Sequence, residues 1–264
     1  MTDQLDVASV RRRLIELGAD AGSVGRVISY SAETGSTNDD AAEGARSGVA
    51  DGSVYVSDYQ SRGRGRRGRT WLSPACESLT FSVVVRPRVA VDNPSTISLA
   101  VGLGVLDALV GFVGNGVGIK WPNDVLVGSR KIAGVLVEAS FAGECCQHMI
   151  IGIGINVLQT HFDPSIAAVA TSLLMEGAKS VCREGVLAAV LMSVDRRVGQ
   201  YFRQGLRSML VDLRERDMTV GRLVRVGNVQ GVADGVDEGG GLRVDLGGAV
   251  RVVSAGECEV VRCA

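Results

Sequence analysis

Residues 61–69, with the sequence SRGRGRRGR, combine two residue types that are well suited to binding phosphate groups. Five of the nine residues are Arg and three are Gly, and the stretch lies between Gln60 and Trp71. Glycine lets backbone N–H groups approach an anion closely, and guanidinium groups neutralise phosphate charge through paired hydrogen bonds. This Arg/Gly loop therefore fits a triphosphate or an acyl phosphate, although it lacks the GxxxxGKS/T pattern of a P-loop.

A stretch so rich in Arg and Gly also suits a solvated surface loop or an RNA-binding segment. The stretch is short, however, and strand-like sequence precedes it at residues 53–59 and follows it at residues 79–85. Binding residues tend to lie on such a loop between rigid elements. We expect the loop to be mobile until an anion offsets the repulsion among its arginines.

Lysine is a second signal, because the chain uses it so rarely. Of the 28 basic residues only three are Lys, and two of these, Lys120 and Lys131, lie in the segment KWPNDVLVGSRK. A compact ammonium places its charge at one point, which a planar guanidinium does not do. The pairing favours a functional role for these two lysines, with chance clustering as the alternative.

The composition excludes several classes of protein. A chain of 264 residues with 46% hydrophobic and 22% charged residues can bury a sizeable core. Its net charge of -1 argues against a general binder of nucleic acid or anionic membranes. The first residues, MTDQLD, lack the pattern of a secretory signal, so we expect a cytoplasmic protein. Neither the six cysteines nor the two histidines show metal-ligand spacing, so no protein metal site is predicted.

Hydrophobic periodicity predicts the elements that position these motifs. We expect helices at residues 7–17, from a cap at Ser36 or Thr37 to Gly48, at 97–112 and at 185–204. We expect strands at residues 26–31, 53–59, 79–85, 118–121, 125–127, 131–138 and 149–157. The apolar run at 97–119 is long enough to cross a membrane, but it contains Asp107, Asn115 and several glycines. We therefore interpret it as a buried helix with a glycine-rich exit.

The sequence changes character near Asp217. The runs VRV, LRVDL and AVRVV follow, separated by glycine-rich turns such as DEGGG. Short runs of this kind are typical of a small β-barrel. The sequence thus predicts an α+β fold, with a larger domain at residues 1–216 and a small β domain at residues 217–264.

Several motifs together resemble one protein family. QSRGRGRRGRTW, KWPNDVLVGSRKIAGVLVE and IIGIGINV, with GSTN upstream and RVVSAGE near the end, resemble in order and spacing the motifs of the biotin protein ligases. The resemblance extends from about Tyr30 to Arg262. It implies a catalytic domain like those of class II aminoacyl-tRNA synthetases and lipoate ligases over residues 1–216. Residues 217–264 would form an SH3-like β domain.

The resemblance also implies a reaction in two steps. The biotin carboxylate attacks the α-phosphate of ATP, which gives biotinyl-5′-AMP and pyrophosphate. A lysine amine of a carrier protein then attacks the acyl carbon, and AMP leaves.

The resemblance assigns roles to individual residues. Lys131 and Arg66 are the expected catalytic residues, because their charges would lie beside the carboxylate and the α-phosphate. The residues expected to bind biotin are Ser36, Thr37, Asn38, Gln60, Arg64, Gly65, Arg66, Lys131 and Gly134. The residues expected to bind the nucleotide are Arg67, Arg69, Trp71, Lys120, Asn123, Asp124 and Asn156. For GSTN a plain helix cap, for Trp71 a core role and for KWPND a structural proline turn are the alternatives.

The expected substrates are ATP and biotin, with Mg²⁺ held largely by phosphate oxygens and water. The expected partner is the biotin carboxyl carrier domain of a carboxylase. The residues before GSTN are too few for a further domain of typical size, so we expect a short form without a DNA-binding domain. We expect no nucleic-acid or membrane partner, and both a monomer and a homodimer stay open.

Two rival functions remain from the sequence. A lipoate or octanoate ligase would share the scaffold and the adenylation chemistry, but the GRGRRG and GSTN motifs favour biotin. A nucleic-acid-binding module would use the Arg/Gly loop alone and would leave KWPND, RKIAG and GIN unexplained.

Overall fold

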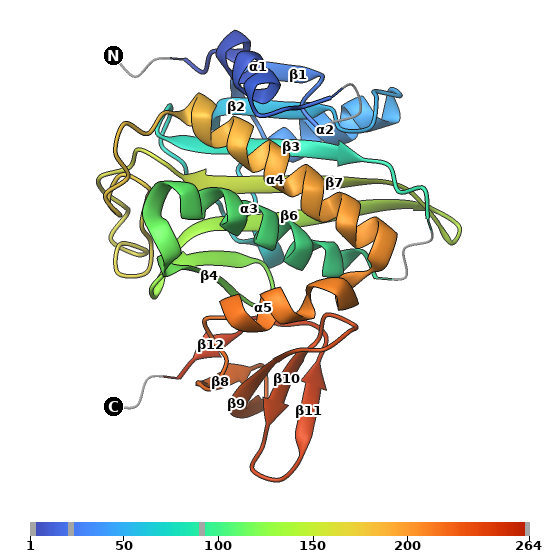
Figure 1. Cartoon of the computed structure of the whole chain (residues 1–264), viewed down its shortest axis with the longest axis vertical. Coiled ribbons are helices and arrows are strands. Elements are labelled where there is room, and N and C mark those ends of the chain that lie inside the picture. The colour runs from blue at the N-terminus through green and yellow to red at the C-terminus, as the bar shows by residue number, and fades with distance from the viewer. Residues whose placement is uncertain (1–3, 21–23, 90–92, 262–264) are drawn as a thin grey trace.

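A computed structural model describes residues 4–20, 24–89 and 93–261, which form two β-sheets with helices around the larger one (Figure 1). The larger sheet has the strand order β1-β2-β3-β7-β6-β5-β4, and the smaller has the order β11-β10-β9-β8-β12. The expected α+β class is therefore confirmed. Of the six cysteines, Cys263 lies outside the described residues.

The elements have the following bounds. The larger sheet contains β1 (Ile28–Thr34), β2 (Val54–Gln60), β3 (Ser78–Val85), β4 (Val117–Lys120), β5 (Asp124–Val127), β6 (Arg130–Ala142) and β7 (Cys145–Asn156). The smaller sheet contains β8 (Leu223–Val226), β9 (Val229–Val236), β10 (Leu242–Asp245), β11 (Val250–Val253) and β12 (Glu259–Val260). The α-helices of the described residues are α1 (Val7–Glu16), α2 (Thr37–Arg46), α3 (Ile97–Val113), α4 (Arg183–Gln204) and α5 (Leu210–Arg216).

These bounds lie close to the predicted ones, with differences at four places, one of which is the two-residue strand β12, which was not predicted. The hairpin of β6 and β7 is longer than predicted, because polar and small residues near its tip continue the ladder from Ser140 to Cys145. The strand β9 was missed, because Gly231 and Gly235 interrupt its apolar pattern. The helix α5 was missed as well, since it is short and depends on tertiary packing.

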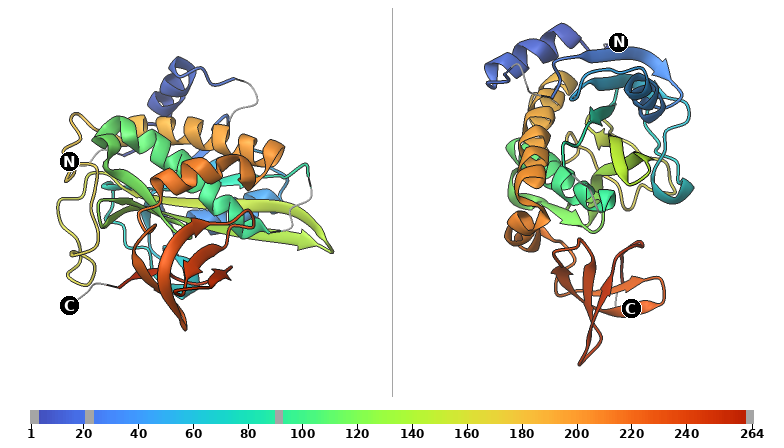
Figure 2. Two further views of the ribbon diagram at one scale, coloured as in Figure 1. Left: turned by 60° about the horizontal axis from the view of Figure 1, so that its bottom comes forward. Right: turned by 90° about the vertical axis from the view of Figure 1, so that its right-hand side faces the viewer.

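The larger sheet is covered on both faces, as the two views of Figure 2 show. On one face, alternate residues of β3 such as Phe81 join the main hydrophobic cluster, to which α3 and α4 also contribute. On the other face Val84 packs with Ala41 and Ala45 of α2. Because side chains alternate along a strand, the polar residues of β3 also lie on the α2 face, where the functional pocket is found.

The helical segment Pro94–Gly116 is long and apolar enough to cross a membrane by length and composition alone. Within this structure, however, most of α3 is buried against α4 and the sheet. At Gly104 the two helices pack so closely that a Cβ atom would lie 2.7 Å from Cα of Val194. Asp107 pairs with Arg197 of α4 at 2.8 Å. The predicted buried helix is therefore present.

The smaller sheet lies at one end of the larger one (Figure 1), and segments beside the two sheets contact each other. The indole Nε1 of Trp121, just after β4, donates to the carbonyl of Gly240 at 2.9 Å. Asp217 forms a parallel bridge with Ile119 of β4, so the connection between the sheets is itself tied to the larger sheet. We keep the division into residues 1–216 and 217–264 as a proposal.

Candidate functional site

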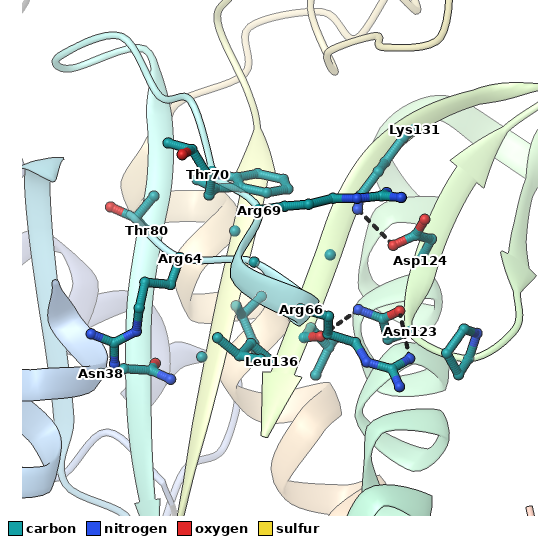
Figure 3. A pocket seen from close by; sticks show the side chains of 18 of the residues that line it. Asn38, Arg64, Arg66, Arg69, Thr70, Thr80, Asn123, Asp124, Lys131 and Leu136 are labelled. Carbon is teal, nitrogen blue, oxygen red and sulfur yellow. Dashed lines mark hydrogen bonds and ion pairs between the residues drawn. The ribbon is translucent and has the colours of Figure 1, made fainter. Parts of the chain in front are cut away.

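A pocket of about 340 Å³ lies between the larger sheet, the start of α2, the Arg/Gly loop and the smaller sheet. Figure 3 shows side chains from α2, the Arg/Gly loop and the larger sheet converging on one space. The predicted site residues that line it are Ser36, Thr37, Asn38, Gln60, Arg64, Gly65, Arg66, Arg69, Trp71, Lys120, Asn123, Asp124, Lys131 and Gly134. The fold thus brings nearly the whole predicted set together.

Two predicted residues do not line this pocket. Arg67 is exposed on the short 3-10 turn Arg66–Gly68, where its φ is 55°. Asn156 is 5% exposed and donates to the carbonyl of Thr171 at 2.9 Å, while its own oxygen accepts from Gln159 at 3.2 Å. In this structure Asn156 therefore anchors the segment that follows β7.

The start of α2 presents polar groups to the pocket. Ser36 occupies the predicted cap position, but its hydroxyl makes no cap hydrogen bond. Instead Oε1 of Gln60, at the end of β2, accepts from the backbone N–H of Thr37 at 2.7 Å. Ser36 is 3% exposed, and none of the described hydrogen bonds uses its hydroxyl, so this buried polar group is available to a ligand.

A chain of hydrogen bonds fixes the next side chain of α2. The hydroxyls of Thr37 and Ser82 lie 2.8 Å apart, and the hydroxyl of Ser82 donates to Oδ1 of Asn38 at 2.6 Å. Gly152 of β7 makes room for this arrangement, since a Cβ atom there would overlap Oδ1 of Asn38. Asn38 is 4% exposed and lines the pocket in a fixed orientation.

The arginines of the loop find partners within the protein itself. Arg64 lies 2.7 Å from Asp39 and 3.2 Å from Glu138, and Arg69 pairs with Glu257 of the segment before β12. The repulsion that suggested a mobile loop is thus partly offset by carboxylates of the chain. Glu257 also lines the pocket, so the segment just before β12 forms part of the pocket wall.

The surroundings of two arginines change their pKa values in opposite directions. Burial, with the nearby charge of Arg67, lowers the pKa of Arg66. Although burial acts to lower the pKa of Arg64 too, hydrogen bonds and charges from Asp39 and Glu138 raise it. Both remain charged near neutral pH, because an Arg side chain titrates far above it. Arg66 is the less firmly held, with one long hydrogen bond of 3.4 Å to Asn123.

Lys131 extends into the pocket from the start of β6. Its Nζ lies 2.6 Å from Asp124 of β5 and 5.5 Å from the ring centre of Trp71. Figure 3 shows the ion pair of Lys131 and Asp124 beside Arg69. A Cβ atom at Gly134 would lie 3.0 Å from Cε of Lys131, so glycine there leaves space for the lysine. The pocket therefore holds a point charge next to a carboxylate and an aromatic ring.

Trp71 lies against a floor made of two glycines. A Cβ atom at Gly154 would overlap its ring, and one at Gly134 would lie 3.2 Å from it. Its Nε1 is buried, and no acceptor for it is found in the parts of the chain that the structure describes. A buried unpaired donor is costly, so a ligand that supplied an acceptor here would gain binding energy.

Gly154→Ala is expected to displace the Trp71 ring toward solvent and to cost about 1–3 kcal/mol of stability, because the added methyl group overfills the contact. Tryptophan fluorescence should shift to the red, and the shift should vanish in a Trp71→Phe background. Gly102→Ala is the control, since its Cβ would meet Ile119 at an ordinary 3.5 Å. An unchanged emission spectrum in Gly154→Ala would contradict this packing.

Sequence reasoning missed some residues of the pocket. They include Thr70, Thr80, Trp121, Leu136, Gly152, Gly154, Glu257, Cys258 and Glu259. The alternating glycines of IIGIGIN were a usable signal for two of them, because glycine inside a strand indicates a close approach by another group. Glu257 lies in RVVSAGE, a motif that was recognised without a role for this residue.

Comparison with known proteins identifies close relatives. Residues 30–156 match the model of the biotin/lipoate A/B protein ligase family. A biotin–acetyl-CoA-carboxylase ligase of Mycobacterium tuberculosis is 37% identical over 96% of this chain and 94% of its own length. The bifunctional ligase/repressor BirA of Bacillus subtilis is 27% identical over 93% of this chain and 78% of its own length.

Solved structures give the same picture for the fold. The biotin protein ligase of Aquifex aeolicus, in complex with biotin and ATP, superimposes with a TM-score of 0.78 and 28% sequence identity. That likeness covers 90% of this chain and all of the Aquifex chain.

Proposed function

Because the chain belongs to the biotin/lipoate A/B protein ligase family, we propose that it is an ATP-dependent ligase that activates biotin as biotinyl-5′-AMP and transfers it to a lysine of a carrier protein. One observation carries this proposal. A single pocket joins an end with the uncharged polar side chains Ser36 and Asn38 to an end lined by Arg66, Arg69 and Lys131. That arrangement suits a molecule with an uncharged polar ring at one end and a phosphoanhydride at the other.

The polar end would bind the ureido ring of biotin. Oε1 of Gln60 is occupied by Thr37, which leaves the amide nitrogen of Gln60 as a donor. The hydroxyl of Ser36 can donate or accept, and the amide nitrogen of Asn38 has a second hydrogen beyond the one bound to Glu138. The two amide donors can therefore bind the carbonyl of a cyclic urea, and the Ser36 hydroxyl can accept from one of its N–H groups.

The cationic end would promote adenylation. A carboxylate oxygen of biotin forms a bond to the α-phosphorus of ATP, and the bond from that phosphorus to the pyrophosphate oxygen breaks. Lys131 and Arg66 would offset the negative charge that grows on the oxygens of the transferred group. Asp124, at 2.6 Å, holds the Lys131 ammonium in place before the substrates bind.

Transfer completes the reaction. The carrier lysine amine forms a bond to the acyl carbon of biotinyl-5′-AMP, the bond from that carbon to the phosphate oxygen breaks, and the amine loses a proton as AMP leaves. We propose that the Arg/Gly loop shields the mixed anhydride from water until the carrier lysine arrives. Its contacts with Asp39, Glu138 and Glu257 would hold it across the pocket.

We also propose that Mg²⁺ accompanies ATP. The described residues contain no cluster of three or more His, Cys, Asp or Glu side chains, so they do not form a protein cage for a metal ion. They do fit an ion bound mainly by phosphate oxygens and water, to which Asp124 could add one oxygen. Such an ion would neutralise triphosphate charge.

The first test is ATP–pyrophosphate exchange with purified protein and Mg²⁺, comparing biotin, lipoate and octanoate. This assay isolates the first step and needs no carrier. We expect exchange that depends on biotin alone. Exchange with lipoate or octanoate instead would assign the protein to the other branch of its family, and no exchange with any of the three acids would reject an adenylating ligase.

We propose the biotin carboxyl carrier domain of a carboxylase as the protein substrate and the cytoplasm as the site of action. The name of the Mycobacterium relative supports the former, because it specifies acetyl-CoA carboxylase as the acceptor. Transfer of label from biotin to an isolated carrier domain would test the assignment, with its acceptor lysine replaced by Arg as the control.

A further inference from the structure

Glu138 is a carboxylate of β6 to which the motif comparison gave no role. Its Oε2 accepts from Nδ2 of Asn38 at 2.5 Å and from Nη2 of Arg64 at 3.2 Å. One oxygen therefore joins the polar end of the pocket to the Arg/Gly loop. Figure 3 shows Asn38 and Arg64 next to each other at this end of the pocket.

Glu138 also sets the direction of a hydrogen-bond chain. The hydroxyls of Thr37 and Ser82 can each donate or accept, so they adapt to either orientation of the Asn38 amide. A carboxylate can only accept, and it therefore turns the amide nitrogen of Asn38 toward itself. The amide oxygen then accepts from Ser82, and the second amide hydrogen of Asn38 is the one left for a ligand.

The same carboxylate holds the loop. Asp39 binds Arg64 at 2.7 and 2.8 Å, and Glu138 adds a second carboxylate to the same guanidinium. Asp39 belongs to α2 and Glu138 to β6, so Arg64 links the loop to two separate elements. With two carboxylates as partners, Arg64 fits an anchor of the loop better than a ligand for phosphate.

From these contacts we propose that Glu138 is a positioning residue that couples closure of the Arg/Gly loop to occupancy of the site at Asn38. The part that concerns biotin rests on the proposed function. A ligand that binds the second amide hydrogen of Asn38 stabilises the arrangement in which Glu138 holds both Asn38 and Arg64, and by reciprocity a closed loop strengthens binding of that ligand. The anchoring of the loop does not depend on the identity of the ligand.

The first experiment measures the loop without any ligand. Trypsin cleaves after arginine, so the rate of nicking within residues 61–69 reports how often the loop opens. We expect Glu138→Ala to be nicked about fivefold faster than wild type, in line with the loss of a partly exposed ion pair. Glu144→Ala is the matched control, because Glu144 is an exposed residue of the turn between β6 and β7 and its loss changes the charge equally. Equal nicking rates in the two variants would overturn the anchoring role.

The second experiment adds biotin alone. We expect biotin to protect the loop of wild type and of Glu144→Ala, and to protect Glu138→Ala much less. The biotin affinity of Glu138→Ala should fall about tenfold, with Glu138→Gln in between because its amide oxygen can still accept. Unchanged melting temperatures would separate this effect from a loss of stability.

The outcomes separate the two proposals. If biotin binds wild type and Glu138→Ala equally well and protects both loops, the coupling is overturned while the proposed function stands. If biotin does not bind wild type at all, the proposed function and the coupling to biotin both fall, and the nicking rates still decide whether Glu138 anchors the loop.

Discussion

Lys131→Ala is expected to lower biotin-dependent pyrophosphate exchange by about 100- to 1,000-fold, the usual effect of removing a group that stabilises charge in the transition state. Lys131 is the pocket's ammonium nearest to Trp71 and Asp124, and its Nζ lies 2.6 Å from that carboxylate. Without it, the carboxylate of Asp124 would lose the ion pair that offsets its charge as the incoming carboxylate and phosphates approach. The affinity for biotin should fall less than the exchange rate, because Lys131 mainly stabilises charge that develops on the transferred group in the transition state.

Lys179→Ala is the matched control for this prediction. Lys179 is exposed and does not line the pocket, so its loss removes the same charge without touching the site. Lys131→Arg should also be slow, because a planar guanidinium cannot place its charge where a compact ammonium does. Circular dichroism and melting temperature should match wild type in all three variants. Wild-type exchange rates in Lys131→Ala would remove Lys131 from the mechanism.

Arg183→Met is expected to lower the free energy of unfolding by about 3–5 kcal/mol, the cost of leaving one member of a buried ion pair behind. Arg183, at the start of α4, lies 2.5 Å from Asp58 of β2, and both side chains are 4% exposed. After the substitution, the remaining described side-chain partner of the Asp58 carboxylate is the hydroxyl of Tyr30, at 2.6 Å. One neutral donor cannot replace a guanidinium.

The Tyr30 hydroxyl stays protonated at neutral pH and can therefore still donate to Asp58 in the variant. Burial, with the hydrogen bond to Asp58, raises the pKa of Tyr30 to about 12. Urea unfolding followed by circular dichroism at neutral pH would measure the effect of Arg183→Met. The control is Arg46→Met, which breaks the exposed pair with Glu43 and should cost less than about 1 kcal/mol. If both substitutions lowered the free energy of unfolding equally, the buried Arg183–Asp58 ion pair would not stabilise the fold more than the exposed pair does.

The sequence predicted most of the larger sheet because its strands are strongly apolar and separated by clear turns. Most of the pocket residues were predicted through the resemblance to the biotin protein ligases, which rests on motifs such as GSTN, the Arg/Gly loop, KWPND and RKIAG. Glu138 was not predicted, since its role depends on a register that places it beside Asn38 and Arg64. No local pattern encodes a contact between residues a hundred positions apart.

Two other features were hidden for the same reason. Nothing near Trp71 shows that its ring rests on Gly134 and Gly154, because those glycines come from two later strands. The resemblance assigned Asn156 to the nucleotide, whereas its hydrogen bonds in this structure hold the segment after β7. The motifs indicate which residues are candidates for the site, whereas the contacts of each residue depend on segments that are distant in the sequence.

The place of β7 between β3 and β6 has a consequence for synthesis of the chain on the ribosome. β3 pairs with β7 along its whole length, from Ser78 with Asn156 to Val85 with Met149. Until β7 emerges, the apolar strand β3 has one bare edge, and such an edge can pair with another nascent chain. Pairing between distant segments is also slow. During the interval between synthesis of β3 and synthesis of β7, this edge of β3 is therefore open to aggregation.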